Sequence, residues 1–176
     1  MRFHRLCFAV FMVAPCVASA ARGDDWPQWL GPRRDATWRE QGLVTTFPAG
    51  GLPVKWRVPV AEGYSGPAVT RGRVYVADYV AREGEVVNGP NDRTNRLGTE
   101  RLLCLDAATG RLLWKREQDC AYSISYASGP RCTPTVADGL VYSLGAEGNL
   151  ACLDATSGEL RWSKDFKKDY SAPTPI

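Results

Sequence analysis

The sequence predicts an all-β fold in which four-stranded antiparallel sheets recur along the chain. Two stretches, 104–114 and 152–162, are nearly identical, and each Asp, Gly and Trp lies 48 positions after its twin (106 to 154, 110 to 158, 114 to 162). Short runs of β-branched and aromatic residues surround these stretches, with Gly or Pro between the runs. Beyond residue 20 we find no apolar period of 3.6 residues, which would indicate amphipathic helices.

Each repeat predicts four strands in a fixed order. The first strand follows a proline and the second carries a tyrosine. The third and fourth are matched between the repeats: 101–105 with 149–153, and 112–114 with 160–162. Upstream, 54–58 has the pattern of a fourth strand, because Trp56 precedes Pro67 by the 11 positions that separate Trp162 from Pro173. Four antiparallel strands in roughly 40 residues form one blade of a β-propeller.

The run Asp-x-x-Thr/Ser-Gly predicts a tight turn between the third and fourth strands. The carboxylate accepts backbone N–H groups across the turn, the hydroxyl adds weaker local bonds, and the glycine supplies a positive φ. The tryptophan after the turn is expected to pack between neighbouring sheets. The residues of this structural motif are Asp106, Thr109, Gly110 and Trp114 in one repeat, and Asp154, Ser157, Gly158 and Trp162 in the next.

This motif resembles the PQQ-type repeat of the quinoprotein dehydrogenase-like superfamily, which also includes non-enzymatic assembly lipoproteins of the BamB type. The resemblance implies a partial β-propeller of four-stranded antiparallel blades, two of them full and two more in part, from a ring of seven or eight. Closed propellers have four to eight blades. We therefore expect a fragment of a longer protein, with assembly of several short chains into one ring as the alternative.

Three segments are expected along the chain. Residues 1–20 have the features of a secretory signal peptide: Arg2 and Arg5, then the apolar run 6–13, then Ala-Ser-Ala at 18–20. The run is too short to span a bilayer. Residues 21–53 form an extended lead-in, similar to that of secreted PQQ-like propellers, and 54–176 holds the incomplete propeller repeats. The sequence thus predicts a periplasmic or extracellular protein with no transmembrane segment.

Charge and histidine content exclude several functions. The chain has 22 basic and 19 acidic residues, and loss of Arg2 and Arg5 with the signal leaves 20 against 19, which does not favour a nucleic-acid partner. The single histidine, His4, leaves with the same segment. A mature chain without histidine has no Ser-His or Cys-His mechanism and no His-ligated metal site. We predict no catalytic residue and no metal ligand set.

The four cysteines beyond the signal divide into two pairs. Cys104 and Cys152 hold the same repeat position, flanked by leucines, and are expected to be small buried side chains. Cys120 and Cys132 are candidates for a disulfide in an oxidising compartment, with two free thiols as the alternative.

The first repeat is longer than the second in two places. From Tyr75 to Cys104 is 29 positions against 10 from Tyr142 to Cys152, which gives 19 extra residues, and 9 more lie between the fourth strand and the next repeat. Both connections leave an antiparallel blade at the same end, so both insertions are expected on one loop face, where recognition is usually built. The alternative is two solvated loops. The candidate ligand or partner residues are Asp78, Asn88, Asn91, Asp92, Arg93, Asn95, Arg96, Tyr122, Tyr126 and Arg131.

Two functions compete at this stage. The first is a secreted binding or scaffold module without catalysis, with a protein or polar small molecule at the loop face. The second, implied by the resemblance, is a fragment of a quinoprotein dehydrogenase that oxidises alcohols or sugars with PQQ and calcium. Oxygen ligands in the first insertion are candidates for that calcium. A third and smaller hypothesis is a sensor domain of a larger secreted or surface protein.

Overall fold

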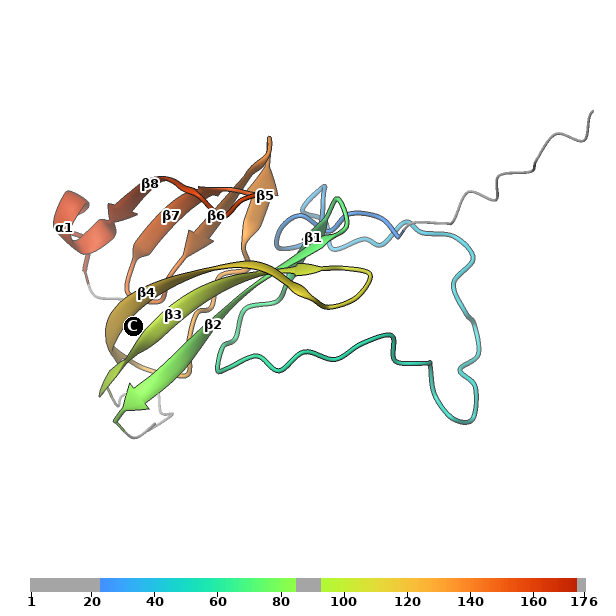
Figure 1. The fold of residues 1–176 in the computed structure, drawn as a ribbon, viewed down its shortest axis with the longest axis horizontal. Coiled ribbons are helices and arrows are strands. Elements are labelled where there is room, and N and C mark those ends of the chain that lie inside the picture. The colour runs from blue at the N-terminus through green and yellow to red at the C-terminus, as the bar shows by residue number, and fades with distance from the viewer. Residues whose placement is uncertain (1–22, 85–92, 174–176) are drawn as a thin grey trace, which may run out of the picture.

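Two four-stranded antiparallel sheets make up the body of the protein. The computed structural model describes residues 23–84 and 93–173. The strands of each sheet are neighbours in sequence order, β1-β2-β3-β4 and β5-β6-β7-β8, as in a meander. The two sheets lie side by side, while the N-terminal segment makes a long excursion away from them (Figure 1). This architecture confirms the predicted partial propeller with two full blades.

The strand bounds show where the two blades differ. In the first blade β2 and β3 have 11 and 13 residues, whereas their counterparts β6 and β7 have 5 and 6. The first blade consists of β1 (Ala68–Thr70), β2 (Arg73–Glu83), β3 (Thr94–Asp106) and β4 (Leu112–Ile124). The second consists of β5 (Thr135–Ala137), β6 (Leu140–Leu144), β7 (Asn149–Asp154) and β8 (Leu160–Asp165).

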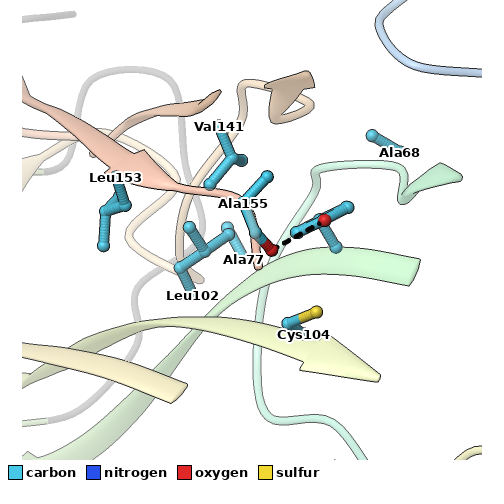
Figure 2. Packing of buried hydrophobic residues seen from close by; sticks show 8 residues of the cluster. Ala68, Ala77, Leu102, Cys104, Val141, Leu153 and Ala155 are labelled. Atoms are coloured by element: carbon cyan, nitrogen blue, oxygen red, sulfur yellow. Dashed lines mark hydrogen bonds between the residues drawn. The ribbon is translucent and has the colours of Figure 1, made fainter. Parts of the chain in front are cut away.

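The core lies between the two blades. Val141, Leu153 and Ala155 of the second blade pack against Leu102 and Cys104 of the first, and all five are almost completely buried. Figure 2 shows these side chains facing one another across the gap between the sheets. Both blades thus present a face of alternating apolar residues, as the period of two along the strands requires.

Two local expectations were wrong. Residues 54–58 form no strand, because no described segment pairs with them as the rest of a blade. A short helix that the sequence did not predict, α1 (Phe166–Tyr170), follows β8. Asp165 caps it by accepting the N–H groups of Lys167 and Lys168, and its own N–H donates to Asp169 at 3.0 Å. This reciprocal cap stabilises one turn that has no buried residue.

The lead-in is held against the first strands of both blades. Trp26 pairs with Val69 of β1 in an isolated antiparallel bridge, and the carbonyl of Pro27 accepts the N–H of Val136 of β5 at 2.8 Å. The Asp25 carboxylate accepts the Thr70 hydroxyl at 2.5 Å. These contacts agree with an extended strap that packs on the body, while the domain boundaries themselves stay a prediction.

Candidate functional site

The repeated turn has the geometry that its sequence predicts. The Oδ1 atom of Asp106 accepts the N–H groups of Ala108 and Thr109 at 3.0 and 2.8 Å, and the Thr109 hydroxyl at 2.8 Å. Gly110 closes the turn with φ 74°. The second copy repeats these bonds around Asp154, whose pKa is lowered to about 2 by the Ser157 N–H and by Arg161. Because both copies have the same geometry, we assign the motif a structural role in closing the turn.

A tryptophan from the preceding blade position also packs on each turn. The indole N–H of Trp114 donates to the carbonyl of Ala155 at 3.2 Å, and the ring covers Gly158 so closely that an added Cβ would lie 2.6 Å from it. Trp56 makes the same bond to Ala107 at 3.1 Å and covers Gly110. Trp114 thus packs between the two sheets as predicted, and Trp56 makes the equivalent contact from a segment that forms no strand, whereas Trp162 is 43% exposed.

The first insertion lengthens strands where a loop was expected. β2 continues to Glu83 and β3 begins at Thr94, so most of the extra residues extend one hairpin. β4 likewise runs to Ile124, through much of the second insertion. The expectation of two long loops was therefore wrong. Across the extended hairpin, backbone N–H and C=O groups hydrogen-bond to each other and need no solvent partner. This favours strands over loops.

At one end of the first blade, contacts join the two insertions to each other and to residues 62–64, which precede β1. Arg96 of β3 donates to the carbonyl of Ala127 at 3.1 Å, and the N–H of Tyr64 donates to the carbonyl of Pro130 at 2.9 Å. Gly129 lies so close to the Glu62 carbonyl that an added Cβ would be 2.5 Å away. The two insertions share one face, as the strand order predicts. We call this region the loop face.

Three of the predicted ligand residues are buried and bonded to other side chains of the protein. Asp78 is 1% exposed and accepts two bonds from Arg101, at 2.8 and 2.6 Å. Arg96 is 5% exposed and forms a bidentate ion pair with Glu62, whose pKa is lowered by that bond. In these two pairs the charges neutralise each other, so Asp78 and Arg96 have structural partners that compete with any ligand.

Tyr122 is the third of these residues. Its ring stacks on Tyr79 with centroids 4.0 Å apart, and its hydroxyl donates to Glu100 at 2.6 Å. Burial raises the pKa of both phenols, for Tyr79 to about 12. Burial also raises the pKa of Glu100, which accepts the N–H of Ala146 in the second blade at 2.8 Å. Tyr122 and Glu100 therefore link the end of the first blade to the second.

Of the remaining candidates, Arg93 and Asn95 lie at the start of β3, and Tyr126 and Arg131 follow β4. Arg93, Asn95 and Tyr126 are exposed, while Arg131 donates to the carbonyls of Ser125 and Tyr126. A groove of ≈ 540 Å³ opens beside Asn95. It is lined by Glu83, Gly84, Asn95, Arg96, Leu97, Ala121, Tyr122 and Ser123. Asn88, Asn91 and Asp92 lie outside the described residues, so the ligand role of the set stays a prediction.

The described part of the loop face does not have the donor set for calcium. Asp78 binds Arg101 with both carboxylate oxygens, and Glu62 is paired with Arg96. Calcium prefers six to eight oxygen ligands with several carboxylates. Within residues 23–84 and 93–173, no cluster of three or more His, Cys, Asp or Glu is placed to hold a metal ion. We therefore derive no step through PQQ or calcium.

The four cysteines of the described residues are free thiols, so Cys120 and Cys132 follow the alternative of two free thiols and not the candidate disulfide. Cys120 lies within β4, is 7% exposed and accepts a weak bond from the Asn149 side chain at 3.7 Å. Cys132 is exposed and lines a groove on the second blade. Their side chains thus occupy different environments, one between the blades and one outside. Cys104 and Cys152 are fully buried, which confirms the prediction for that pair.

Sequence reasoning missed the acidic partners of this region. Glu62 and Glu100 carry no repeat signature, and their partners lie 34 and 22 positions away. Glu147 is 5% exposed and pairs with Lys167 of α1. No helix in the described ranges is long and apolar enough to cross a membrane.

Comparison with known proteins gives a family match and partial similarities to solved structures, of which two are described. Residues 98–175 match the family model described as outer membrane protein assembly factor BamB. The quinohemoprotein alcohol dehydrogenase ADHIIG from Pseudomonas putida HK5 is 22% identical over 65% of this chain and 15% of its own, with a TM-score of 0.39. A europium-containing methanol dehydrogenase is 19% identical over 59% of this chain and 25% of its own, with a TM-score of 0.30. No curated protein matches the chain.

The match covers only a small part of each of these two structures. This chain spans 15% of the first and 25% of the second, so neither activity carries over to it. The repeat pattern, the two blades and the family match agree on a propeller of PQQ-type repeats.

Proposed function

We propose that this chain, which carries PQQ-type β-propeller repeats, is an exported binding or scaffold module that holds a partner at its loop face and has no catalysis of its own. The observation that carries the proposal is the extended β2–β3 hairpin. It is twice the length of its counterpart in the second blade, and it ends in the exposed side chains of Arg93 and Asn95.

Contacts along the described part of the hairpin support a role in recognition. The Asp78–Arg101 and Glu62–Arg96 pairs fix its two strands, and the stacked Tyr79 and Tyr122 rings support it from the second blade's side. Polar groups on a fixed scaffold lose little conformational entropy on binding. Asn95, which lines the groove of ≈ 540 Å³, and the exposed Arg93 suit a polar or acidic protein surface or a polar small molecule.

The family match supports a protein partner over a small molecule. The matched model is described as an assembly factor for outer membrane proteins, and residues 98–175 include most of β3 and all of the second blade. Export follows from the proposed signal at residues 1–20. The mature protein is periplasmic or extracellular in this proposal, and N-terminal sequencing of the secreted chain would find Ala21 first.

Site-specific photocrosslinking tests the proposal. A photoreactive residue at Asn95 reports on the loop face, and one at Glu159, an exposed side chain in the turn at the opposite end of the strands, is the control. We expect a discrete crosslinked protein in the exported fraction from position 95 and none from position 159. The absence of a discrete product at 95, or equal products at both positions, would contradict the assignment.

A titration with PQQ and calcium tests the alternative that the resemblance implied. A dehydrogenase fragment for alcohols or sugars would bind PQQ with saturation and support dye-linked oxidation. The scaffold proposal expects neither, and saturable binding with turnover would overturn it.

A further inference from the structure

The lead-in begins with a closed loop between Asp24 and Glu40. The backbone N–H of Asp24 donates to the Glu40 carboxylate, which brings the two ends of the loop together. Inside the loop, the N–H of Gly31 donates to the Gln28 carbonyl at 3.0 Å, and the Arg34 guanidinium donates to the Gln28 side chain at 3.0 Å. Compact surface loops whose ends meet in this way frequently carry function.

This loop is anchored to the first strands of both blades, at the end away from the loop face. The Asp25 carboxylate accepts the Thr70 hydroxyl at 2.5 Å and the N–H of Arg71, in the β1–β2 turn, at 3.0 Å. The carbonyl of Pro27 accepts the N–H of Val136 of β5. Figure 1 shows the segment beside β1. These bonds fix the loop on the body of the protein, so its side chains have a defined arrangement.

A pocket of ≈ 310 Å³ opens within the loop. Every lining residue of the described chain lies between positions 24 and 39, so one continuous segment forms the pocket and no blade contributes to it. Its volume reaches the range of about 300 to 1,000 Å³ that is typical of small-molecule sites.

Two indole rings form the apolar part of the pocket. Trp38 is 60% exposed, and the ring of Trp26 packs on Gly31, where an added Cβ would lie 2.8 Å from it. Neither indole N–H has a hydrogen-bond partner within residues 23–84 and 93–173. A fixed aromatic surface with free N–H groups at its edge suits a ligand that is apolar on one face and polar at its rim.

The charged groups that line the pocket balance one another. Two carboxylates, Asp24 and Asp25, lie there with two guanidinium groups, Arg33 and Arg39. Asp25 is bonded to the β1–β2 turn, and Arg39 donates twice to Asp35, at 3.3 and 2.5 Å. Among the described residues this leaves the Asp24 carboxylate and the Arg33 guanidinium without a partner. One free acceptor and one free donor, with no net charge, favour a neutral ligand with hydroxyl groups over a cation or an anion.

The backbone around the pocket is strained. Leu30, Arg34 and Ala36 have φ values of 64°, 56° and 54°, in the left-handed region that side chains disfavour. Such conformations persist only where the surrounding contacts hold them, and they are concentrated at ligand sites. The walls of the pocket are therefore set before a ligand arrives, which lowers the entropy lost on binding.

We propose that this pocket binds a neutral saccharide. The C–H groups on one face of a sugar ring pack on the exposed Trp38 indole, and the hydroxyl groups at its rim donate to Asp24 and accept from Arg33. The site goes beyond the proposed partner contact, because it lies at the opposite end of the first blade from the loop face.

Isothermal titration calorimetry of the purified chain with maltohexaose, cellohexaose and chitohexaose tests the proposal. We expect saturable binding of at least one of these neutral oligosaccharides, and Trp38→Ala should weaken it by about tenfold or more, as for an aromatic residue at the centre of a site. Trp29→Ala is the matched control, because Trp29 lies in the same loop, is 67% exposed and does not line this pocket. No saturable binding of any of the three up to about 10 mM, or equal losses in the two tryptophan variants, would overturn the proposal.

Variants of the two free charged groups and charged probes test the chemistry of the ligand. Asp24→Ala and Arg33→Ala should each weaken oligosaccharide binding by about threefold or more, as for the loss of one hydrogen bond. Binding that neither change weakens would contradict their roles. Choline tests a cation held over the two indoles, and inorganic phosphate tests an anion at Arg33. Binding of either probe that Trp38→Ala or Arg33→Ala abolishes, without binding of any neutral oligosaccharide, would replace the saccharide as the ligand.

Discussion

Trp114 donates its indole N–H to the Ala155 carbonyl at 3.2 Å and covers Gly158, and Trp56 repeats this contact on Ala107 and Gly110. A single motif thus sets two properties at once. Its carboxylate and glycine close a turn within a blade, and the same glycine leaves space for the ring from the neighbouring blade position. Recurrence of the motif along the sequence follows from this double role.

Gly158→Ala should destabilise the fold more than the same change in a glycine with equal backbone geometry. Gly158 has φ 74° and its added Cβ would lie 2.6 Å from the Trp114 ring, whereas Gly139 has φ 79° with open space around it. We expect a loss of about 1 kcal/mol for Gly139→Ala from backbone strain. Gly158→Ala should lose about 2 kcal/mol or more, since the ring must also move. Urea denaturation measures both, and equal losses would exclude the ring contact as the cause.

The repeat could be predicted from the sequence because its residues interact locally. Asp106, Thr109 and Gly110 lie within five positions, so spacing alone indicates the turn and the strands on each side. Val54 to Val58 was misassigned for the opposite reason, since a strand exists only where a neighbouring strand pairs with it. The sequence pattern places Trp56 at the fourth-strand position of a blade. The structure confirms its indole bond to the Ala107 carbonyl, although the segment around it joins no sheet.

The loop face could be placed but not described from the sequence. Counting residues between matched positions located both insertions at the same end. The residue types alone favoured a polar binding surface, yet Arg96 and Asp78 have charged partners 34 and 23 positions away. Pairs at such distances leave no periodic signal. Polar residues in an insertion are therefore divided between internal pairs and the surface only by the fold.

Truncation to alanine should lower the stability of the protein at Arg96 and leave it unchanged at Arg93. Arg96→Ala removes a bidentate bond to Glu62 and a bond to the Ala127 carbonyl at a site 5% exposed, so we expect it to cost about 2 kcal/mol of stability. Arg96 was predicted from the sequence to contact a partner, as Arg93 was, but its bonds to Glu62 and Ala127 give it a structural role. Arg93 is exposed, so Arg93→Ala should leave the melting temperature unchanged.

Differential scanning calorimetry of the two variants, with the crosslinking yield at position 95 as the second readout, separates the roles. Loss of crosslinking in Arg93→Ala with native stability supports a binding role for the exposed arginine. Equal melting temperatures for Arg96→Ala and the parent would show that the Glu62 pair does not hold the hairpin.

The free thiols predict a simple labelling pattern. In the folded protein begun at Ala21, a maleimide should modify Cys132 rapidly and leave Cys104, Cys120 and Cys152 unmodified until unfolding, because only Cys132 is exposed. Burial also raises the pKa of Cys120 to about 12, which suppresses its thiolate. Intact mass spectrometry counts the labels. A chain with no reactive thiol before reduction and two new labels after it would contain the Cys120–Cys132 disulfide.

Glu100 should make the stability of the protein depend on pH above the acid range. Burial between the blades raises its pKa above the ordinary value, with the neighbouring Glu147 adding to the rise, while the Tyr122 hydroxyl and the Ala146 N–H oppose it. A carboxyl with a raised folded-state pKa binds protons more tightly in the folded state. Its contribution is therefore present at low pH and is lost as pH rises from its unfolded pKa through its folded pKa.

Glu100→Gln should remove this loss, because the amide oxygen still accepts from Tyr122 and Ala146 and carries no charge. The variant and the parent should differ little near pH 4. Above that pH the variant should become the more stable, by about 1.4 kcal/mol for each unit by which the pKa is raised. Melting curves from pH 4 to 8 measure the difference. Glu117→Gln, at an exposed ion pair with Lys115, is the control and should change stability by about 0.5 kcal/mol or less throughout. A constant gap between Glu100→Gln and the parent across the range would show that Glu100 does not titrate with folding.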